Sequence, residues 1–200
     1  MITKQKPKID KEILDAIKSF NWDFITDFGY NTISHLRGGQ MNFLRGTLME
    51  QLMGRQDSLL ECVREDHKDF IWHRYGITVE LKSQFNQSMY NKGGRLKNEY
   101  KVNLCNMRSM KKITKQQICD LVLVLRKDGA FVITKDDAFQ NIRQIGKQVD
   151  IICGSNDIIE VSGYKSLSSV QQAFDINETV LKFCDSLIDD AKKHYDSRPK

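Results

Sequence analysis

The heptapeptide ITVELKS, residues 77–83, sets a carboxylate and an ammonium two residues apart in a run of apolar side chains. Alternate residues of a strand share one face, so Glu80 and Lys82 would project together from the face opposite the apolar residues. Their Cα atoms would lie about 6.5–7 Å apart. A divalent metal ion on Glu80 would then have the Lys82 ammonium just beyond it, and the carbonyl of Leu81 could turn toward the same ion.

A second carboxylate is needed, because Mg²⁺ takes a few hard oxygen ligands in addition to its waters. Asp69 begins the stretch DFIW, eleven residues before Glu80. A strand at this stretch, a turn at Tyr75-Gly76 and the ITVELKS strand would form a hairpin. That hairpin would bring Asp69 back beside Glu80 and Lys82.

Glu50 is a third candidate carboxylate, on a helix expected over about residues 40–54. It falls on the same side of that helix as Phe43, Gly46 and Met53, so it borders the apolar side. A carboxylate in that position needs a partner. A metal cluster shared with Asp69 and Glu80 would supply one.

An E-x-K tripeptide alone also fits a Glu–Lys ion pair on a solvated strand face. Together, however, Glu50, Asp69 and ELK at 80–82 resemble the motif of the PD-(D/E)XK nuclease superfamily, and within it the type II restriction endonucleases. The resemblance spans about residues 40–134. The family often has a proline before the aspartate, whereas Lys68 stands there in this chain, and Asp66 is therefore an alternative to Asp69.

This resemblance implies a fold and a chemistry. The fold would be of the α/β (α+β) class, a restriction-endonuclease-like core with a mixed central β-sheet flanked by helices. Asp69 and Glu80 would hold Mg²⁺, with the Leu81 carbonyl as a further ligand and Glu50 assisting through a metal-bound water or a second ion. Lys82 would orient or help deprotonate the attacking water. The reaction would hydrolyse double-stranded DNA to 5′-phosphate and 3′-hydroxyl ends, and a homodimer would match a palindromic site.

The segment 84–112 is polar and rich in Asn, Gln, Arg and Lys, with little apolar periodicity. Asn and Gln can pair with adenine and Arg with guanine in the major groove, while Lys suits phosphates. A solvated loop would use the same residue types, but long loops inside a compact domain are often functional. The residues first expected to contact DNA are Gln84, Asn86, Lys92, Arg95 and Lys97.

The remaining pattern predicts the elements that position these groups in one nuclease domain over residues 1–200. Its catalytic core would cover about 40–134, and C-terminal strands and a helix would occupy 149–196. The expected helices are one capped by Asp10 and reaching Phe20, one over 40–54, a short one at 114–119 and one after Asn177. The expected strands are 58–63, 70–73, 77–83, 121–125 with a hairpin partner after Asp128-Gly129, and either 149–153 or 158–161.

Composition narrows the classes of function. The net charge of +5, from 31 Lys and Arg against 26 Asp and Glu, permits a polyanionic partner without requiring one. Five cysteines without a C-x-x-C motif predict reduced thiols, and the lack of a long apolar run or a signal-peptide pattern predicts a soluble, cytoplasmic protein without a membrane partner. Glycine-rich phosphate loops and nucleophile elbows are absent. Two alternatives to a restriction enzyme remain: a structure-selective nuclease of the junction-resolvase or repair type, and a non-catalytic DNA-binding regulator.

Overall fold

The computed structural model describes residues 9–31, 39–65, 68–164 and 189. Its centre is a six-stranded sheet in the order β1-β2-β3-β5-β6-β9. Strands β3 and β5 pair in parallel, and the other neighbours pair antiparallel, so the sheet is mixed. The strands are β1 (Leu60–Glu65), β2 (Lys68–Trp72), β3 (Ile77–Gln84), β5 (Leu121–Arg126), β6 (Gly129–Thr134) and β9 (Ile159–Glu160).

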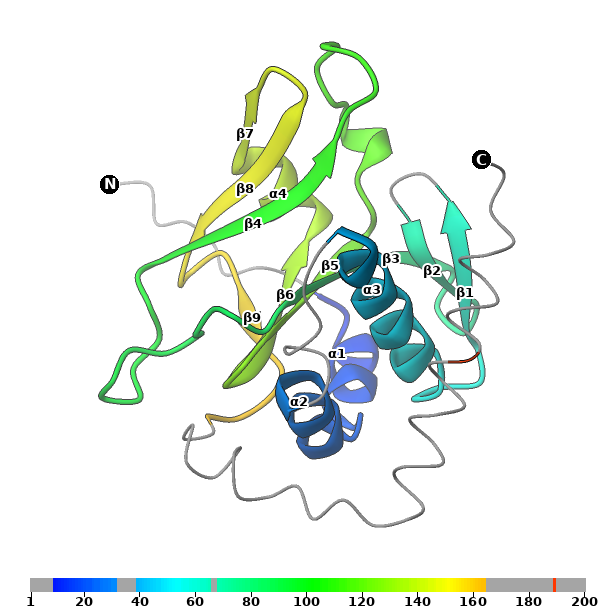
Figure 1. The fold of residues 1–200 in the computed structure, drawn as a ribbon, viewed down its shortest axis with the longest axis vertical. Helices are drawn as coiled ribbons and strands as arrows, with labels where there is room; N and C mark the ends of the chain where they lie inside the picture. Colours follow the sequence, from blue (N-terminus) through cyan, green and yellow to red (C-terminus); the bar gives the residue numbers. More distant parts are fainter. Residues whose placement is uncertain (1–8, 32–38, 66–67, 165–188, 190–200) are drawn as a thin grey trace.

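Three helices cover one face of this sheet (Figure 1). They are α1 (Lys11–Lys18), α2 (Trp22–Asn31) and α3 (Gly39–Gly54). Leu48 and Leu52 of α3 and Ile25 of α2 are almost fully buried against strand residues such as Val79 and Leu123. The carboxylate of Asp10 accepts a hydrogen bond of 2.8 Å from the Glu12 amide, which caps the start of α1.

A smaller sheet covers the other face. Its strands lie in the order β4-β8-β7, with β4 (Glu99–Asn106), β8 (Gln148–Gly154) and β7 (Ile142–Ile145), and they rise together at the top left of Figure 1. Val122 and Val124 of β5 pack in a second core with Val102 and Ile151 of this smaller sheet. Helix α4 (Lys135–Gln140) adds Ala138 to the same core. The central sheet is therefore buried on both faces.

The expected α/β (α+β) class with a mixed central sheet flanked by helices is confirmed. The helices at 11–18 and 39–54 and the first three strands also stand where the sequence predicts them. The stretch LVLVL is a fully buried strand with β6 as its hairpin partner. Both alternatives for the later strand are present, as β8 and β9, and a 3₁₀-helix, η2 (Lys115–Gln117), stands within the predicted helix at 114–119.

Other expectations are wrong. The segment 84–112 is not one long loop, because it contains β4, an edge strand of the smaller sheet whose buried residues lie in the second core. In β4, Tyr100, Val102 and Leu104 are buried and alternate with exposed polar residues, a period-two pattern that indicates a strand. Helices α2 and α4 and strand β7 were not predicted. On that face the smaller sheet and α4 together cover the central sheet.

Some predictions fall beyond the described part of the chain. The C-terminal helix after Asn177, apart from Asp189, lies outside it, and so do Asp66 and Cys184. Among the described cysteines, Cys62, Cys105, Cys119 and Cys153 form no disulfide with one another. Within the described residues, no helix has the length and apolar character needed to cross a bilayer.

Candidate active site

The β2–β3 hairpin brings Asp69 to Glu80, as the spacing of the sequence predicts. Phe70 pairs with Val79 and Trp72 with Ile77. One further step of this register sets Asp69 across from Glu80, and directly opposed residues of an antiparallel pair point to the same face. Gly76 closes the turn with a φ of +63°, a conformation that glycine adopts without steric cost.

The side chains of β3 alternate between the two cores. Val79 and Leu81 lie in the core under the helices. Glu80 and Lys82 face the opposite way, because they pair with Val122 and Val124, which belong to the second core. The Glu80 and Lys82 side chains therefore project between the central sheet and the smaller sheet. Their shared face is not the solvated surface that a simple ion pair would occupy.

Three charged groups meet on this face. The amide of Leu81 donates a 2.6 Å hydrogen bond to Oδ2 of Asp69. The Nζ atom of Lys82 forms an ion pair with Oε1 of Glu80. Glu80 is only 5% exposed, and its other carboxylate oxygen, Oε2, has no hydrogen-bond partner among the described residues. Two carboxylates thus share one ammonium, and one buried oxygen is unsatisfied.

The close approach of the two carboxylates affects the pKa of Asp69. Burial and the neighbouring charge of Glu80 raise the pKa of Asp69 to about 6, although the Leu81 amide and Lys82 act in the opposite direction. Burial alone would lower the pKa of Lys82, but the charges of Glu80 and Asp69 raise it above its ordinary value. Lys82 is therefore an ammonium at neutral pH. Additional positive charge would stabilise ionised Asp69.

The backbone of Leu81 offers a further oxygen. A strand residue presents its N–H and C=O to the same side. The Leu81 amide reaches Asp69, so the Leu81 carbonyl faces the same edge of β3. This edge is where β2 begins, at Lys68. The predicted role of the Leu81 carbonyl is compatible with this placement.

Glu50 does not join this group. Its Oε2 atom lies 4.0 Å from Sγ of Cys62 on β1, and Cys62 packs against the helix-side core. Asp69 and Glu80 project from the other face of the sheet. Within the described residues, no group of three or more His, Cys, Asp or Glu side chains is arranged to hold a metal ion. The carboxylate pair Asp69 and Glu80 is thus the part of the predicted ligand set that the fold brings together.

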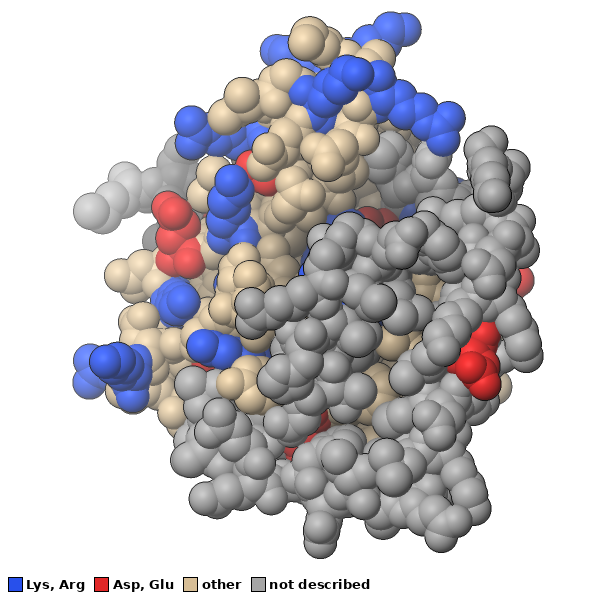
Figure 2. Space-filling view, in the orientation of Figure 1, with Lys and Arg blue, Asp and Glu red and all other residues tan. Residues whose placement is uncertain are grey.

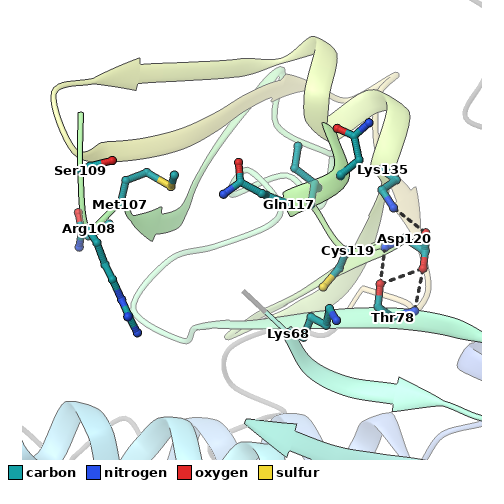
Figure 3. Close-up of a pocket in the computed structure, with 12 residues that line it drawn as sticks. Lys68, Thr78, Met107, Arg108, Ser109, Gln117, Cys119, Asp120 and Lys135 are labelled. Atoms are coloured by element: carbon teal, nitrogen blue, oxygen red, sulfur yellow. Dashed lines mark hydrogen bonds and ion pairs between the residues drawn. The ribbon is translucent and has the colours of Figure 1, made fainter. Parts of the chain in front are cut away.

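A polar cleft of about 640 Å³ opens beside the pair. It is lined by Lys68, which precedes Asp69, and by Thr78, which shares the face of Glu80. Burial and the charges of Glu80 and Asp69 raise the pKa of Cys119 in the cleft wall to about 12, consistent with their proximity. Figure 3 shows Lys68, Cys119 and Lys135 on one side of the cleft and Arg108 on the other.

Asp120 fixes one wall of this cleft. Its Oδ2 atom accepts hydrogen bonds of 2.8 Å from both the amide and the hydroxyl of Thr78. Its Oδ1 atom lies 2.9 Å from Nζ of Lys135. These contacts tie β3 to β5 and hold the Lys135 ammonium at the cleft, and they lower the pKa of Asp120 against the opposing effect of burial.

The residues first expected to contact DNA lie elsewhere. Gln84 ends β3, about 13 Å along the strand from Glu80. Asn86, Lys92 and Arg95 are exposed beyond it. Lys92 and Lys97 line a different cleft, of about 620 Å³, together with Asp128. Because β3 and β5 run in parallel, Asp120 and Asp128 mark opposite ends of the sheet.

Sequence reasoning did not single out Lys68, Arg108, Gln117 and Lys135 as one set. Arg108 lies within the polar segment 84–112, but nothing local distinguishes it from its neighbours. Lys135 follows a buried hairpin and carries no signal of its own. No family model, curated protein or solved structure matches this chain in comparisons of sequence and fold.

Proposed function

We propose that the protein is a Mg²⁺-dependent endonuclease of the type II restriction class that hydrolyses phosphodiesters of double-stranded DNA. One observation carries this proposal. Asp69, Glu80 and Lys82 converge on one buried face beside a cleft lined by Lys68, Arg108 and Lys135. Paired carboxylates suit a divalent ion, and the cations around them suit a polyanionic substrate.

The residues present fit Mg²⁺. This ion commonly binds through one or two carboxylates and keeps several waters, so a cage of three acidic residues is not required. Asp69 and Glu80 carry two negative charges against the single ammonium of Lys82, and Oε2 of Glu80 lacks a partner. We assign Asp69, Glu80 and the Leu81 carbonyl as the ligands. When bound, Mg²⁺ would acidify a water molecule and offset charge on the phosphate.

Lys82 positions charge and water in this scheme. In the structure its ammonium is held by Glu80. A cation held by Glu80 would weaken this ion pair and leave the Lys82 ammonium able to face the scissile phosphate and the attacking water. There the ammonium would stabilise the negative charge that develops on the phosphoryl oxygens. A methionine at position 82 would keep the length of the side chain and remove this charge.

Lys68, Arg108 and Lys135 bind the DNA backbone in this proposal. Their side chains reach the cleft from three elements that are distant in sequence. Phosphate contacts of this kind set the register of a duplex without reading its bases. The products are 5′-phosphate and 3′-hydroxyl ends, two subunits cut the two strands, and the cytoplasm is the compartment in which such an enzyme meets DNA.

Incubation of the purified protein with plasmid DNA tests the proposal. With Mg²⁺ we expect discrete linear fragments, and with EDTA or with the Lys82→Met variant we expect none. Sequencing of the fragment ends then gives the site and the end chemistry. Selective cutting of branched DNA would instead support a structure-selective nuclease of the junction-resolvase or repair type. Binding without cleavage in both Mg²⁺ and Mn²⁺ would support a non-catalytic regulator.

A further inference from the structure

Two turns at the end of the smaller sheet form one unit, called here the basic tip (residues 107–113 and 143–147). The amide of Met107 donates a 2.7 Å hydrogen bond to the carbonyl of Lys147. Gln144 binds the other segment twice, through the Ile113 amide at 3.1 Å and the Lys111 carbonyl at 2.9 Å. These three contacts join segments more than thirty residues apart. These hydrogen bonds hold the two turns together as one structural unit.

The charge of the tip is of one sign. The residues 106–119 and 141–149 contain no Asp or Glu. Figure 2 shows Lys and Arg side chains gathered at the top of the molecule, where β4 ends and β7 turns into β8. The exposed cations of the tip are Arg108, Lys111, Lys112, Arg143 and Lys147. A chain with a net charge of only +5 thus concentrates positive charge at one end of one sheet.

Two apolar side chains stand among these cations. Met110 is 75% exposed and Ile145 is 62% exposed, the highest values among the large hydrophobic residues of the described part of the chain. Ile145 ends β7 at its turn into β8, and Met110 lies between Ser109 and Lys111 in the other turn. The two side chains add apolar contact groups to a surface that otherwise offers only charged and polar ones. Thymine methyl groups in the major groove are natural partners for such side chains.

We infer that the basic tip enters the major groove of double-stranded DNA, with its cations on the flanking phosphates and Met110 and Ile145 against base edges. This inference rests on the proposed function and names the element that grips its substrate. The major groove accommodates a two-stranded ribbon such as β7–β8. Three residues of the tip also line the cleft: Met107, Arg108 and Ser109. A duplex bound to the tip would therefore extend along the cleft, beside Asp69 and Glu80. The tip thus replaces segment 84–97 as the recognition element.

Binding of a labelled random-sequence duplex in EDTA, measured by fluorescence anisotropy over a range of salt concentrations, tests this inference without cleavage. The double variant Lys111→Ala/Lys147→Ala is compared with Lys11→Ala/Lys18→Ala, which removes the same charge from exposed positions on α1. For the tip variant we expect the slope of log K against log salt to fall in magnitude by about two and affinity near 0.1 M salt to drop by roughly tenfold or more. The α1 variant should bind as the wild type does.

A third variant, Lys92→Ala/Lys97→Ala, separates the tip from the other basic cleft. The inference would be overturned if the wild type and the tip variant bound the duplex with equal affinity. It would also be overturned if only Lys92→Ala/Lys97→Ala lost affinity, or if the wild type did not bind the duplex. Thermal melting verifies that each variant is folded, and Lys112→Ala/Arg143→Ala provides an independent pair. Tip-dependent binding without Mg²⁺-dependent cleavage would reject the nuclease proposal and leave the inference standing.

Discussion

The two ends of the parallel pair β3–β5 each carry basic residues and an aspartate, but their carboxylates differ in how they are satisfied. At one end Asp128, 3% exposed, accepts hydrogen bonds from Ser88 and from the amides of Met89 and Tyr90. Both of its oxygens are used inside the protein. At the other end Glu80 has a buried oxygen without a partner, beside a second carboxylate. Basic residues therefore do not distinguish the two ends, whereas the buried Glu80 oxygen without a hydrogen-bond partner does.

The largest expected effect is a loss of DNA cleavage when a carboxylate at the Glu80 end is replaced. Asp69→Asn and Glu80→Gln should each lower Mg²⁺-dependent cleavage by about a thousandfold or more, because removing a metal ligand forfeits several kcal/mol of transition-state stabilisation. Cleavage rates at saturating enzyme measure this. Retention of wild-type rates by either variant would move the chemistry away from β3.

The second effect concerns stability at the opposite end. Asp128→Ala removes an acceptor from the Ser88 hydroxyl and from the amides of Met89 and Tyr90, although Ser88 and Tyr90 still bond each other, and this should lower the free energy of unfolding by about 1–3 kcal/mol. Urea denaturation measures the loss. Cleavage per folded molecule should be unchanged under conditions in which the variant remains native. A thousandfold loss of cleavage in this variant would erase the distinction between the two ends.

The third effect is stabilisation by the metal ion. A Mg²⁺ concentration of one hundred times its dissociation constant should stabilise the wild type by about 2.7 kcal/mol, since the ion binds only the folded site. Asp69→Asn should lose most of this gain. Thermal melting with and without Mg²⁺ provides the measurement. An equal shift in wild type and variant would place the ion elsewhere.

The smallest effect follows from the pKa of Asp69, which is raised to about 6 in the folded protein. Between about pH 4 and pH 6 the native state binds a proton that the unfolded state has released, so without metal the stability falls as pH rises. Asp69→Asn removes this dependence and should gain about 1–2 kcal/mol relative to wild type between pH 4 and pH 7. Urea denaturation of both proteins at several pH values in EDTA tests the direction in which stability changes with pH. A wild type that loses stability relative to Asp69→Asn as the pH falls from 7 to 4 would contradict it.

Local sequence patterns were sufficient to predict the centre of the candidate site. The alternation within residues 77–83 and the turn at Gly76 determine which side chains share a face and which residue lies across from Glu80. Both are short-range properties of a strand and a hairpin, so the sequence predicts Asp69, Glu80 and Lys82 together. The buried run at 121–125 likewise identifies the neighbouring strand.

The surroundings depend on long-range packing that sequence patterns do not contain. Glu50 falls on the apolar side of its helix, but the choice of sheet face for α3 sets it beside Cys62. The cleft takes Lys68, Arg108 and Lys135 from three separate elements. Strand β4 was detectable from its alternation, yet its polar exposed residues resemble those of a loop. Tertiary packing decided each of these outcomes.

The order in which these contacts can form has a consequence for folding. Asp69 and Glu80 meet across a short hairpin, whereas the Thr78–Asp120 contact beside them joins residues 42 apart in the chain. Hairpins close in microseconds, and long-range parallel pairing is much slower because a large loop must be ordered first. The carboxylates of Asp69 and Glu80 are thus brought together early, before β5 pairs with β3 and shields them from water. Divalent ions present during refolding should therefore accelerate the later step.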